Sequence, residues 1–331
     1  MKVLILGGTG MLGYPTALEF LRRGHEVHTV SSRPARIDAE FDQGVRQHAL
    51  NLADATEEDL LTVLRGMDVL IYALGPDDRV TPPAPALTYF RRELADRTAR
   101  LLTLARQAGV KKAVVFGSYF ATFDRLHPAW GLAARHPYVQ ARVEQARRAI
   151  QAGQEPGAAP HMDVIILEIP YVFGVTPGRE PFWKAVLFDR VRGGRVALYP
   201  KGGSVVMTTT QLAQAAVGAA LHGPHGAHYP VGDVNMTWTD LIGLIRSELG
   251  VPPRVVHVPE FLTRLNLQAE GRRHRAQGLE SGLNPDTLAA DIMYRELYPD
   301  VQESRRVLGY ASGGVQDAIR QTVRASYPTR G

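Results

Sequence analysis

The 331-residue chain contains no cysteine and little lysine, which occurs only at positions 2, 111, 112, 184 and 201. Without cysteine it has no disulfides, no thiol nucleophile and no thiolate metal ligands. No apolar run approaches the roughly 18 residues of a membrane-spanning helix, and the first apolar run is too short for a signal peptide. These absences predict a cytoplasmic protein that makes no membrane contact.

Because lysine is scarce, the net charge of +5 is carried almost entirely by arginine. A modest positive balance suits an anionic ligand, which is a nucleotide, a sugar nucleotide or a nucleic acid. The arginines are spread along the chain and are not clustered with aromatic residues, which disfavours nucleic-acid binding. Histidines at 222, 225 and 228 lack an evident carboxylate partner, so we expect no metal site.

A glycine-rich stretch follows the first apolar run and is the most informative feature of the sequence. Residues 3–6 are predicted to form a buried strand and residues 14–23 a helix. Gly7 permits a tight turn, Gly10 lets the backbone approach phosphates, and Gly13 lets the helix pack on the strand. The first-turn amides and the helix dipole then face an anion. The predicted binding loop for a dinucleotide pyrophosphate comprises Gly7, Thr9, Gly10, Met11, Leu12 and Gly13.

Strands and helices alternate through the first half of the chain, which predicts an α/β fold with a Rossmann-type, doubly wound parallel sheet. The predicted strands cover residues 3–6, 26–30, 45–50, 68–74, 112–116 and 163–169, and the helices 14–23, 59–65, 88–108 and 136–152. We expect residues 1–170 to bind the dinucleotide and residues 171–331 to form a smaller α/β lobe for the substrate. Part of residues 205–235 is expected to pack back on the large sheet. Residues 260–296 are predicted to be mostly helical.

This order of motifs resembles the extended short-chain dehydrogenase/reductase family, the nucleotide-sugar epimerases and dehydratases, over most of the chain. The resemblance is strong to about residue 175 and looser beyond it. It implies an NAD(P)-dependent enzyme that transfers hydride to or from a carbinol or carbonyl carbon of a sugar nucleotide or a similar substrate.

In that family the end of the second strand selects the cofactor. An acidic residue there binds the ribose of NAD, while small polar residues and an arginine accept the 2′-phosphate of NADP. Here the strand is followed by Ser31, Ser32 and Arg33, with Arg36 close behind. The resemblance therefore implies NADP in preference to NAD.

Other cofactor contacts are implied at three places. Asn51 and Leu52 match the family's stretch around adenine. The residues at the end of the fourth strand, where backbone touches the cofactor, are Ala73, Leu74 and Gly75. Pro170 and Val172 match the stretch that passes the nicotinamide amide, and Glu168 stands where the family commonly has arginine. Substrate diphosphate clamps are sought among the arginines at 179, 195, 272, 273 and 275.

The catalytic pair departs from the family pattern of tyrosine followed four residues later by lysine. The matching positions are Tyr138 and Arg142, which the i, i+4 spacing stacks on one helix face. Tyr138 is expected to act as general acid or base, with Arg142 lowering its pKa and binding the nicotinamide ribose. Ser118 or Tyr119, just after the fifth strand, is expected to polarise the reacting oxygen.

The missing lysine keeps a second hypothesis open, in which Tyr138 and Arg142 only line the pocket of a cofactor-binding sensor that has lost its chemistry. Nucleic-acid binding on the same fold is a third hypothesis. Charged residues on the outer face of the 88–108 helix argue against the apolar helix bundle through which the family often dimerises, so we expect a monomer or a different dimer.

Overall fold

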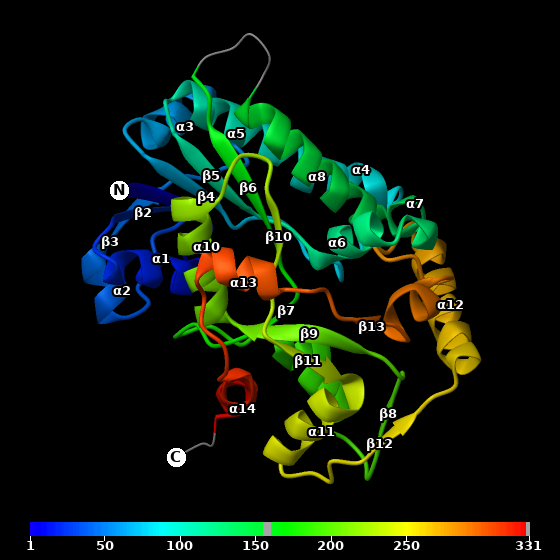
Figure 1. Ribbon diagram of the computed structural model, residues 1–331. Helices are drawn as coiled ribbons and strands as arrows, with labels where there is room; N and C mark the ends of the chain where they lie inside the picture. The colour runs from blue at the N-terminus through cyan, green and yellow to red at the C-terminus, as the bar shows by residue number, and fades with distance from the viewer. Residues whose placement is uncertain (155–159, 329–331) are drawn as a thin grey trace.

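The computed structural model describes residues 1–154 and 160–328. Its centre is a seven-stranded, wholly parallel sheet in the order β10-β6-β5-β4-β1-β2-β3 (Figure 1). The strands are β1 (Lys2–Leu6), β2 (Glu26–Ser31), β3 (Val45–Ala49), β4 (Val69–Tyr72), β5 (Lys112–Phe116), β6 (Asp163–Glu168) and β10 (His228–Pro230). The strand order reverses between β1 and β4, the place where ligands bind in such sheets. The predicted Rossmann-type α/β fold is confirmed.

Both faces of this sheet are buried because alternate residues of each strand point to opposite sides. Val3 and Ile5 face one core, and Leu4 and Leu6 face the other. The first core is covered by α1 (Gly13–Arg22), α2 (Ala39–Gly44), α10 (Thr209–His222) and α13 (Gln302–Leu308). The second is covered by α3 (Glu57–Leu64), α5 (Arg97–Gln107) and α8 (Pro137–Gly153).

The segments that follow β4 and β5 carry short helices. The predicted helix over residues 88–108 consists of α4 (Ala86–Phe90), a π-helical stretch (Arg91–Asp96) and α5. After β5, the chain forms α6 (Tyr119–Leu126), a 3₁₀ turn (Pro128–Trp130) and α7 (Leu132–Arg135). α6 is not among the helices predicted from the sequence. Ser118 caps its N-terminus, because the Ser118 side chain accepts a hydrogen bond from the Phe120 N–H.

The second lobe is built on a four-stranded sheet below the large one in Figure 1. Its strands are β7 (Tyr171–Phe173), β9 (Gly203–Thr208), β11 (Val234–Thr237) and β13 (Glu296–Leu297). A two-stranded sheet pairs β8 (Ala197–Tyr199) with β12 (Val255–His257). The remaining helical segments are a π-helical stretch (Lys184–Phe188), α9 (Asp189–Val191), α11 (Trp238–Glu248), α12 (Glu260–Ala276), a second π-helical stretch (Ala289–Met293) and α14 (Val315–Ser326).

The structure of residues 171–328 tests two of the predictions made from the sequence. Between β9 and β11 the chain returns to the large sheet, where α10 packs on α1 and β10 pairs in parallel with β6. The prediction that residues 260–296 are mostly helical is confirmed by α12 and the π-helical stretch Ala289–Met293, which turns and a short loop separate. The division at residue 170 stays a prediction. In the part of the chain that the structure describes, no helix has the length and apolar character to cross a bilayer.

A buried carboxylate ties together three elements near the β10 edge of the large sheet. Glu168, at the end of β6, is fully buried and accepts two hydrogen bonds from Arg125 at 2.7 and 2.8 Å. Its other partners are the Thr122 hydroxyl on α6 and, at 3.0 Å, the Nδ1 of His228 on β10. Burial favours the neutral acid, but the partners prevail and lower the pKa of Glu168 to about 2.

This network predicts an acid-sensitive contribution to stability. Because the pKa of Glu168 falls from 4.5 to about 2 on folding, its contribution is complete above about pH 5 and is lost as the pH falls towards 2. The shift corresponds to about 3 kcal/mol of unfolding free energy. Glu168→Gln should be less stable at neutral pH and should lack this part of the acid dependence in urea titrations. Glu303→Gln, which removes an exposed ion pair with Arg306, is the control; equal acid slopes for the wild type and Glu168→Gln would contradict the assignment.

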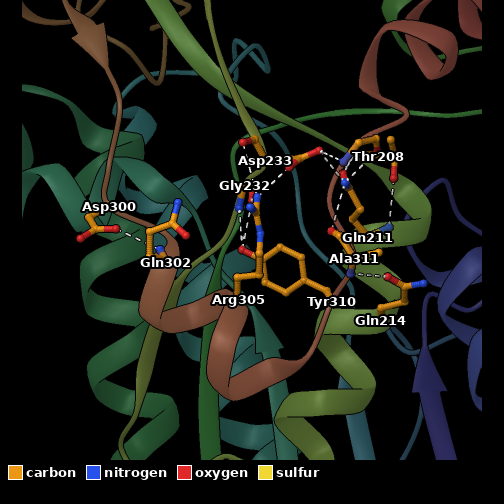
Figure 2. Close-up of polar contacts among 11 residues, drawn as sticks. Thr208, Gln211, Gln214, Gly232, Asp233, Asp300, Gln302, Arg305, Tyr310 and Ala311 are labelled. Atoms are coloured by element: carbon orange, nitrogen blue, oxygen red, sulfur yellow. Dashed lines mark hydrogen bonds and ion pairs between the residues drawn. The ribbon is translucent and has the colours of Figure 1, made fainter.

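A second buried network fastens the C-terminal segment. The Asp233 carboxylate, just after β10, accepts hydrogen bonds from Arg305 at 2.6 Å and from the Gly313 N–H at 2.7 Å. It also accepts one from Gln211 on α10 at 2.7 Å. The Tyr310 hydroxyl donates to the Gly232 carbonyl at 3.0 Å. Figure 2 shows these groups converging from α10, α13 and the turn after β10.

We expect Asp233→Asn to destabilise the protein by about 3 kcal/mol, the lower end for breaking a buried pair, because Arg305 is partly exposed. Asp300→Asn is a matched control, since Asp300 is exposed and its side chain accepts a hydrogen bond from the Gln302 N–H at 2.9 Å. Urea denaturation followed by circular dichroism measures both. Equal losses in the two variants would argue against a special role for the Asp233 network.

Candidate functional site

The glycine-rich loop leaves β1 through a turn that admits no side chain. Gly7 has a φ of +85°, and a Cβ there would lie 2.6 Å from the Ala73 carbonyl oxygen. A Cβ on Gly13 would overlap the Gly7 carbonyl. The Gly10 N–H donates to the Gly7 carbonyl at 2.9 Å, which closes the turn. The backbones of β1, α1 and the end of β4 thus meet where glycine alone fits.

The N-terminus of α1 is open. Its N-cap residue, Leu12, provides no side-chain hydrogen bond to the first-turn amides. The Tyr14 N–H donates to the Gly10 carbonyl at 2.9 Å and Pro15 has no N–H, so the attraction for an anion comes chiefly from the positive end of the helix dipole. This helix end without a side-chain cap, at a loop without room for side chains, fits a dinucleotide pyrophosphate.

The residues expected around the adenosine lie at the ends of β2 and β3. The Ser31 hydroxyl donates to the Arg33 carbonyl at 2.7 Å, and Ser32 and Arg33 are exposed. The nearest downstream carboxylate, Asp38, accepts from the Phe41 N–H at the start of α2. Asn51 is also engaged locally, because its side-chain oxygen accepts from the Ala53 N–H at 3.2 Å.

A cavity of about 330 Å³ lies at the carboxyl ends of β1, β4, β5 and β6. Many of the residues expected at the site line it together. They are Gly10, Met11, Leu12, Gly13, Ala73, Leu74, Gly75, Ser118, Tyr119, Tyr138, Arg142, Pro170 and Val172. Gly7, Thr9, Ser31, Ser32, Arg33, Asn51 and Leu52 are not among its lining residues.

Tyr138 and Arg142 are stacked on the first turns of α8, as their spacing predicts. The Nε of Arg142 donates to the Tyr138 hydroxyl at 2.9 Å. The same guanidinium donates to the Phe116 carbonyl at 3.2 Å and to the Gln145 side chain at 2.8 Å. Arg142 is therefore held by the protein as well as by the tyrosine.

The expected lowering of the Tyr138 pKa is wrong for this structure. Burial raises the pKa of the Tyr138 hydroxyl above its ordinary value, and the charge of Asp78 adds to the effect. Arg142 lowers it but does not outweigh burial. Tyr138 is therefore a neutral phenol at physiological pH. Its oxygen accepts from Arg142, so its own proton is free for another acceptor.

Ser118 and Tyr119 lie in different surroundings. The Ser118 oxygen accepts from the Phe120 N–H at 3.3 Å, which leaves its proton free. The Tyr119 hydroxyl accepts from Ser204 at 3.1 Å, and burial raises the Tyr119 pKa well above its ordinary value. Both line the cavity.

The C-terminal half also supports the start of α8. The Tyr138 N–H donates to the Gly282 carbonyl at 2.9 Å. A Cβ on Gly282 would lie 2.6 Å from the Phe90 ring and 3.1 Å from the Tyr138 Cβ. A segment after α12 therefore packs directly behind the tyrosine.

One wall of the cavity, formed by charged and aromatic side chains, is not predicted from the sequence. Asp78 and Arg79, in the loop after β4, form an ion pair at 3.2 Å, and burial raises the pKa of Asp78. The Arg79 guanidinium lies 5.1 Å from the centre of the Trp183 ring and 5.3 Å from that of Phe182. The sequence offers one indication of Asp78 and Arg79: they follow β4, and residues after this strand lie at the edge of the sheet where ligands bind.

Glu168, which stands where the family commonly has arginine, and two of the three spaced histidines have hydrogen-bond partners within the protein. Glu168 is neutralised by Arg125 and is not among the cavity-lining residues, so no inverted charge faces the cavity. Of the spaced histidines, His225 accepts from the Val164 N–H and His228 bonds Glu168. Among residues 1–154 and 160–328, no group of three His, Asp or Glu side chains is arranged to hold a metal ion.

Solved structures share the whole fold. A nucleoside-diphosphate-sugar epimerase from Pseudomonas aeruginosa superposes with a TM-score of 0.72 at 18% identity, over 98% of this chain and 97% of that one. UDP-glucose 4-epimerase from Bifidobacterium longum, in complex with NAD⁺ and UDP, gives 0.68 at 15% identity over 98% of both chains. MoeE5, in complex with UDP-glucuronic acid and NAD, gives 0.69 at 16% identity over the full length of both. At these identities the likeness establishes the fold.

No protein of curated function matches the sequence. Residues 3–203, more than half of the chain, match the NAD-dependent epimerase/dehydratase family. The match runs from β1 through the glycine-rich loop and α8 into β9. The chain therefore belongs to the NAD-dependent epimerase/dehydratase family, a family of NAD-dependent enzymes.

Proposed function

We propose that this enzyme prefers NADP and transfers hydride to or from a carbinol or carbonyl carbon of a sugar-like, nucleotide-linked substrate. The observation that carries the proposal is the shared cavity, in which the loop at Gly10–Gly13, Ser118 and Tyr138 meet. Relatives of the same fold are complexed with UDP-sugars and NAD, which supports the substrate class.

The cofactor is assigned to the path along the sheet edge. The glycine-rich loop holds the pyrophosphate, and Ser31, Ser32 and Arg33 take the 2′-phosphate. Asn51 and Leu52 border the adenine. Ala73, Leu74, Gly75, Pro170 and Val172 approach the nicotinamide half, which supplies or accepts the hydride when bound.

Tyr138 is assigned the proton transfer. Its phenol is neutral and accepts from Arg142, so it can donate its proton to a substrate oxygen as a carbonyl becomes a carbinol. Arg142 orients the phenol, and Ser118 supplies a second hydrogen bond to the same oxygen, with Tyr119 as the alternative donor. The raised pKa of Tyr138 favours the general-acid role.

A monomer, or a dimer through another surface, is also part of the proposal. The outer faces of the 91–107 helix and α8 are joined within the chain by ion pairs. Arg91 pairs with Glu144 at 2.7 Å, and Arg148 pairs with Asp96. Charged residues are depleted in interface cores, so this surface is poorly suited to an apolar helix bundle.

Tyr138→Phe keeps the ring and removes the hydroxyl, and with it both the transferable proton and the acceptor for Arg142. We expect it to lower turnover of an active nucleotide sugar by about 10²- to 10⁴-fold, the usual contribution of general acid–base catalysis. A panel of UDP- and dTDP-sugars with NADPH or NADP⁺, followed by nicotinamide absorbance and product chromatography, provides the measurement. Tyr89→Phe is a control, because Tyr89 lies on α4 and does not line the cavity. Full activity of Tyr138→Phe would remove the assigned chemistry.

Arg33→Ala tests the cofactor preference. Among residues 1–154 and 160–328, no carboxylate forms an ion pair with the exposed Arg33, so its charge is free for a phosphate. We expect the Kd for NADPH to rise about tenfold, as for losing one charge-assisted hydrogen bond, while the Kd for NADH stays unchanged. Calorimetric titration measures both, with the exposed Arg46 as an alanine control. Equal effects on the two cofactors would reject the 2′-phosphate role.

A further inference from the structure

Arg179 reaches across the molecule to the glycine-rich loop. It lies after β7, in a turn where its N–H donates to the Thr176 carbonyl at 3.2 Å and Gly178 adopts a φ of +70°. Its guanidinium donates to the Thr9 hydroxyl at 3.2 Å, although the two residues are 170 positions apart. Thr9 is only 7% exposed and lies between Gly7 and Gly10. The contact therefore joins the second lobe to the phosphate loop.

The charge of Arg179 is not neutralised by a neighbouring acid. The adjacent Glu180 pairs with Lys184 at 2.6 Å. In the described ranges, 1–154 and 160–328, no carboxylate forms an ion pair with Arg179. The residue is exposed, and most of its N–H donors remain available.

The unpaired cation lies against Thr9 of the glycine-rich loop, the loop that leads into the N-terminus of α1. A guanidinium binds phosphate oxygens through paired, charge-assisted hydrogen bonds. We propose that Arg179 clamps the pyrophosphate of the dinucleotide cofactor against the glycine-rich loop. Arg179 is one of the arginines expected to bind a substrate diphosphate, whereas its contact with Thr9 favours the cofactor. The inference rests on the proposed cofactor binding.

The segment that carries Arg179 continues directly into the aromatic wall of the cavity. Phe182 and Trp183 follow Arg179 closely and both line the cavity. The Trp183 indole donates to the Val172 carbonyl at 2.6 Å, and its ring stacks on Tyr171 with centres 4.9 Å apart. A pyrophosphate held by Arg179 therefore fixes one end of the segment that forms the aromatic wall.

Calorimetric titration of Arg179→Ala tests the clamp without any substrate turnover. We expect the Kd values for NADPH, NADH and ADP-ribose to rise together by about tenfold or more, because all three carry the pyrophosphate. The Kd for adenosine 2′-monophosphate, which lacks it, should not change. Arg179→Lys should recover part of the affinity, since the charge remains but the paired geometry is lost. Arg254→Ala, which changes another exposed arginine of the second lobe, is the matched control and should bind like the wild type.

Two results would overturn the inference while leaving the proposed function intact. One is unchanged affinity of Arg179→Ala for all three dinucleotide ligands. The other is weaker binding of UDP with unchanged binding of NADPH, which would assign Arg179 to the substrate diphosphate. Failure of the wild-type protein to bind any dinucleotide would instead reject the proposed function itself.

Discussion

The close backbone approach at Gly7 and Gly13 is the constraint on which the rest of the site depends. β1, α1 and the end of β4 come together there without side chains between them. This contact sets the angle at which α1 leaves the sheet, with an N-terminus that no side chain caps. The cavity, the proposed cofactor path and the contact from Arg179 are all arranged around that edge. A single methyl group at either glycine would displace backbone, which cannot yield as a flexible side chain can.

The pair formed by Tyr138 and Arg142 shows how burial can outweigh a nearby charge. Arg142 donates to the phenol, as a neighbouring cation should. Its guanidinium is also shared with a carbonyl and an amide oxygen, while burial and Asp78 act in the opposite direction on the phenol pKa. The planar, forked arginine thus holds the tyrosine in place more than it acidifies it. Such a pair is better suited to delivering a proton than to removing one.

Much of the fold follows from local sequence patterns, since apolar strands alternating with amphipathic helices have few arrangements besides a parallel sheet covered on both faces. The glycine-rich loop and the i, i+4 pair on α8 are local in the same sense. Other features depend on contacts between distant residues. The Glu168 network joins β6 to α6 and β10, and Asp78 and Arg79 acquire their surroundings only when Trp183 packs over them. Hydrophobic periodicity and residue spacing do not predict such contacts between distant residues. The pKa of Tyr138 is equally hard to predict, because it depends on burial by residues distant in sequence.

The hydrogen bond from the Tyr138 N–H to the Gly282 carbonyl makes the first half of the chain depend on the second. β10 completes the large sheet from the second half of the chain, and the segment around Gly282 supports the first turn of α8 from still further along. The first half of the chain therefore does not complete its own sheet or support α8 alone. A chimera that exchanged the second lobe for that of a relative at a single junction after β6 would lose an edge strand and the segment that packs behind Tyr138. Recombination within this fold would have to carry over β10 and the Gly282 segment with the first half.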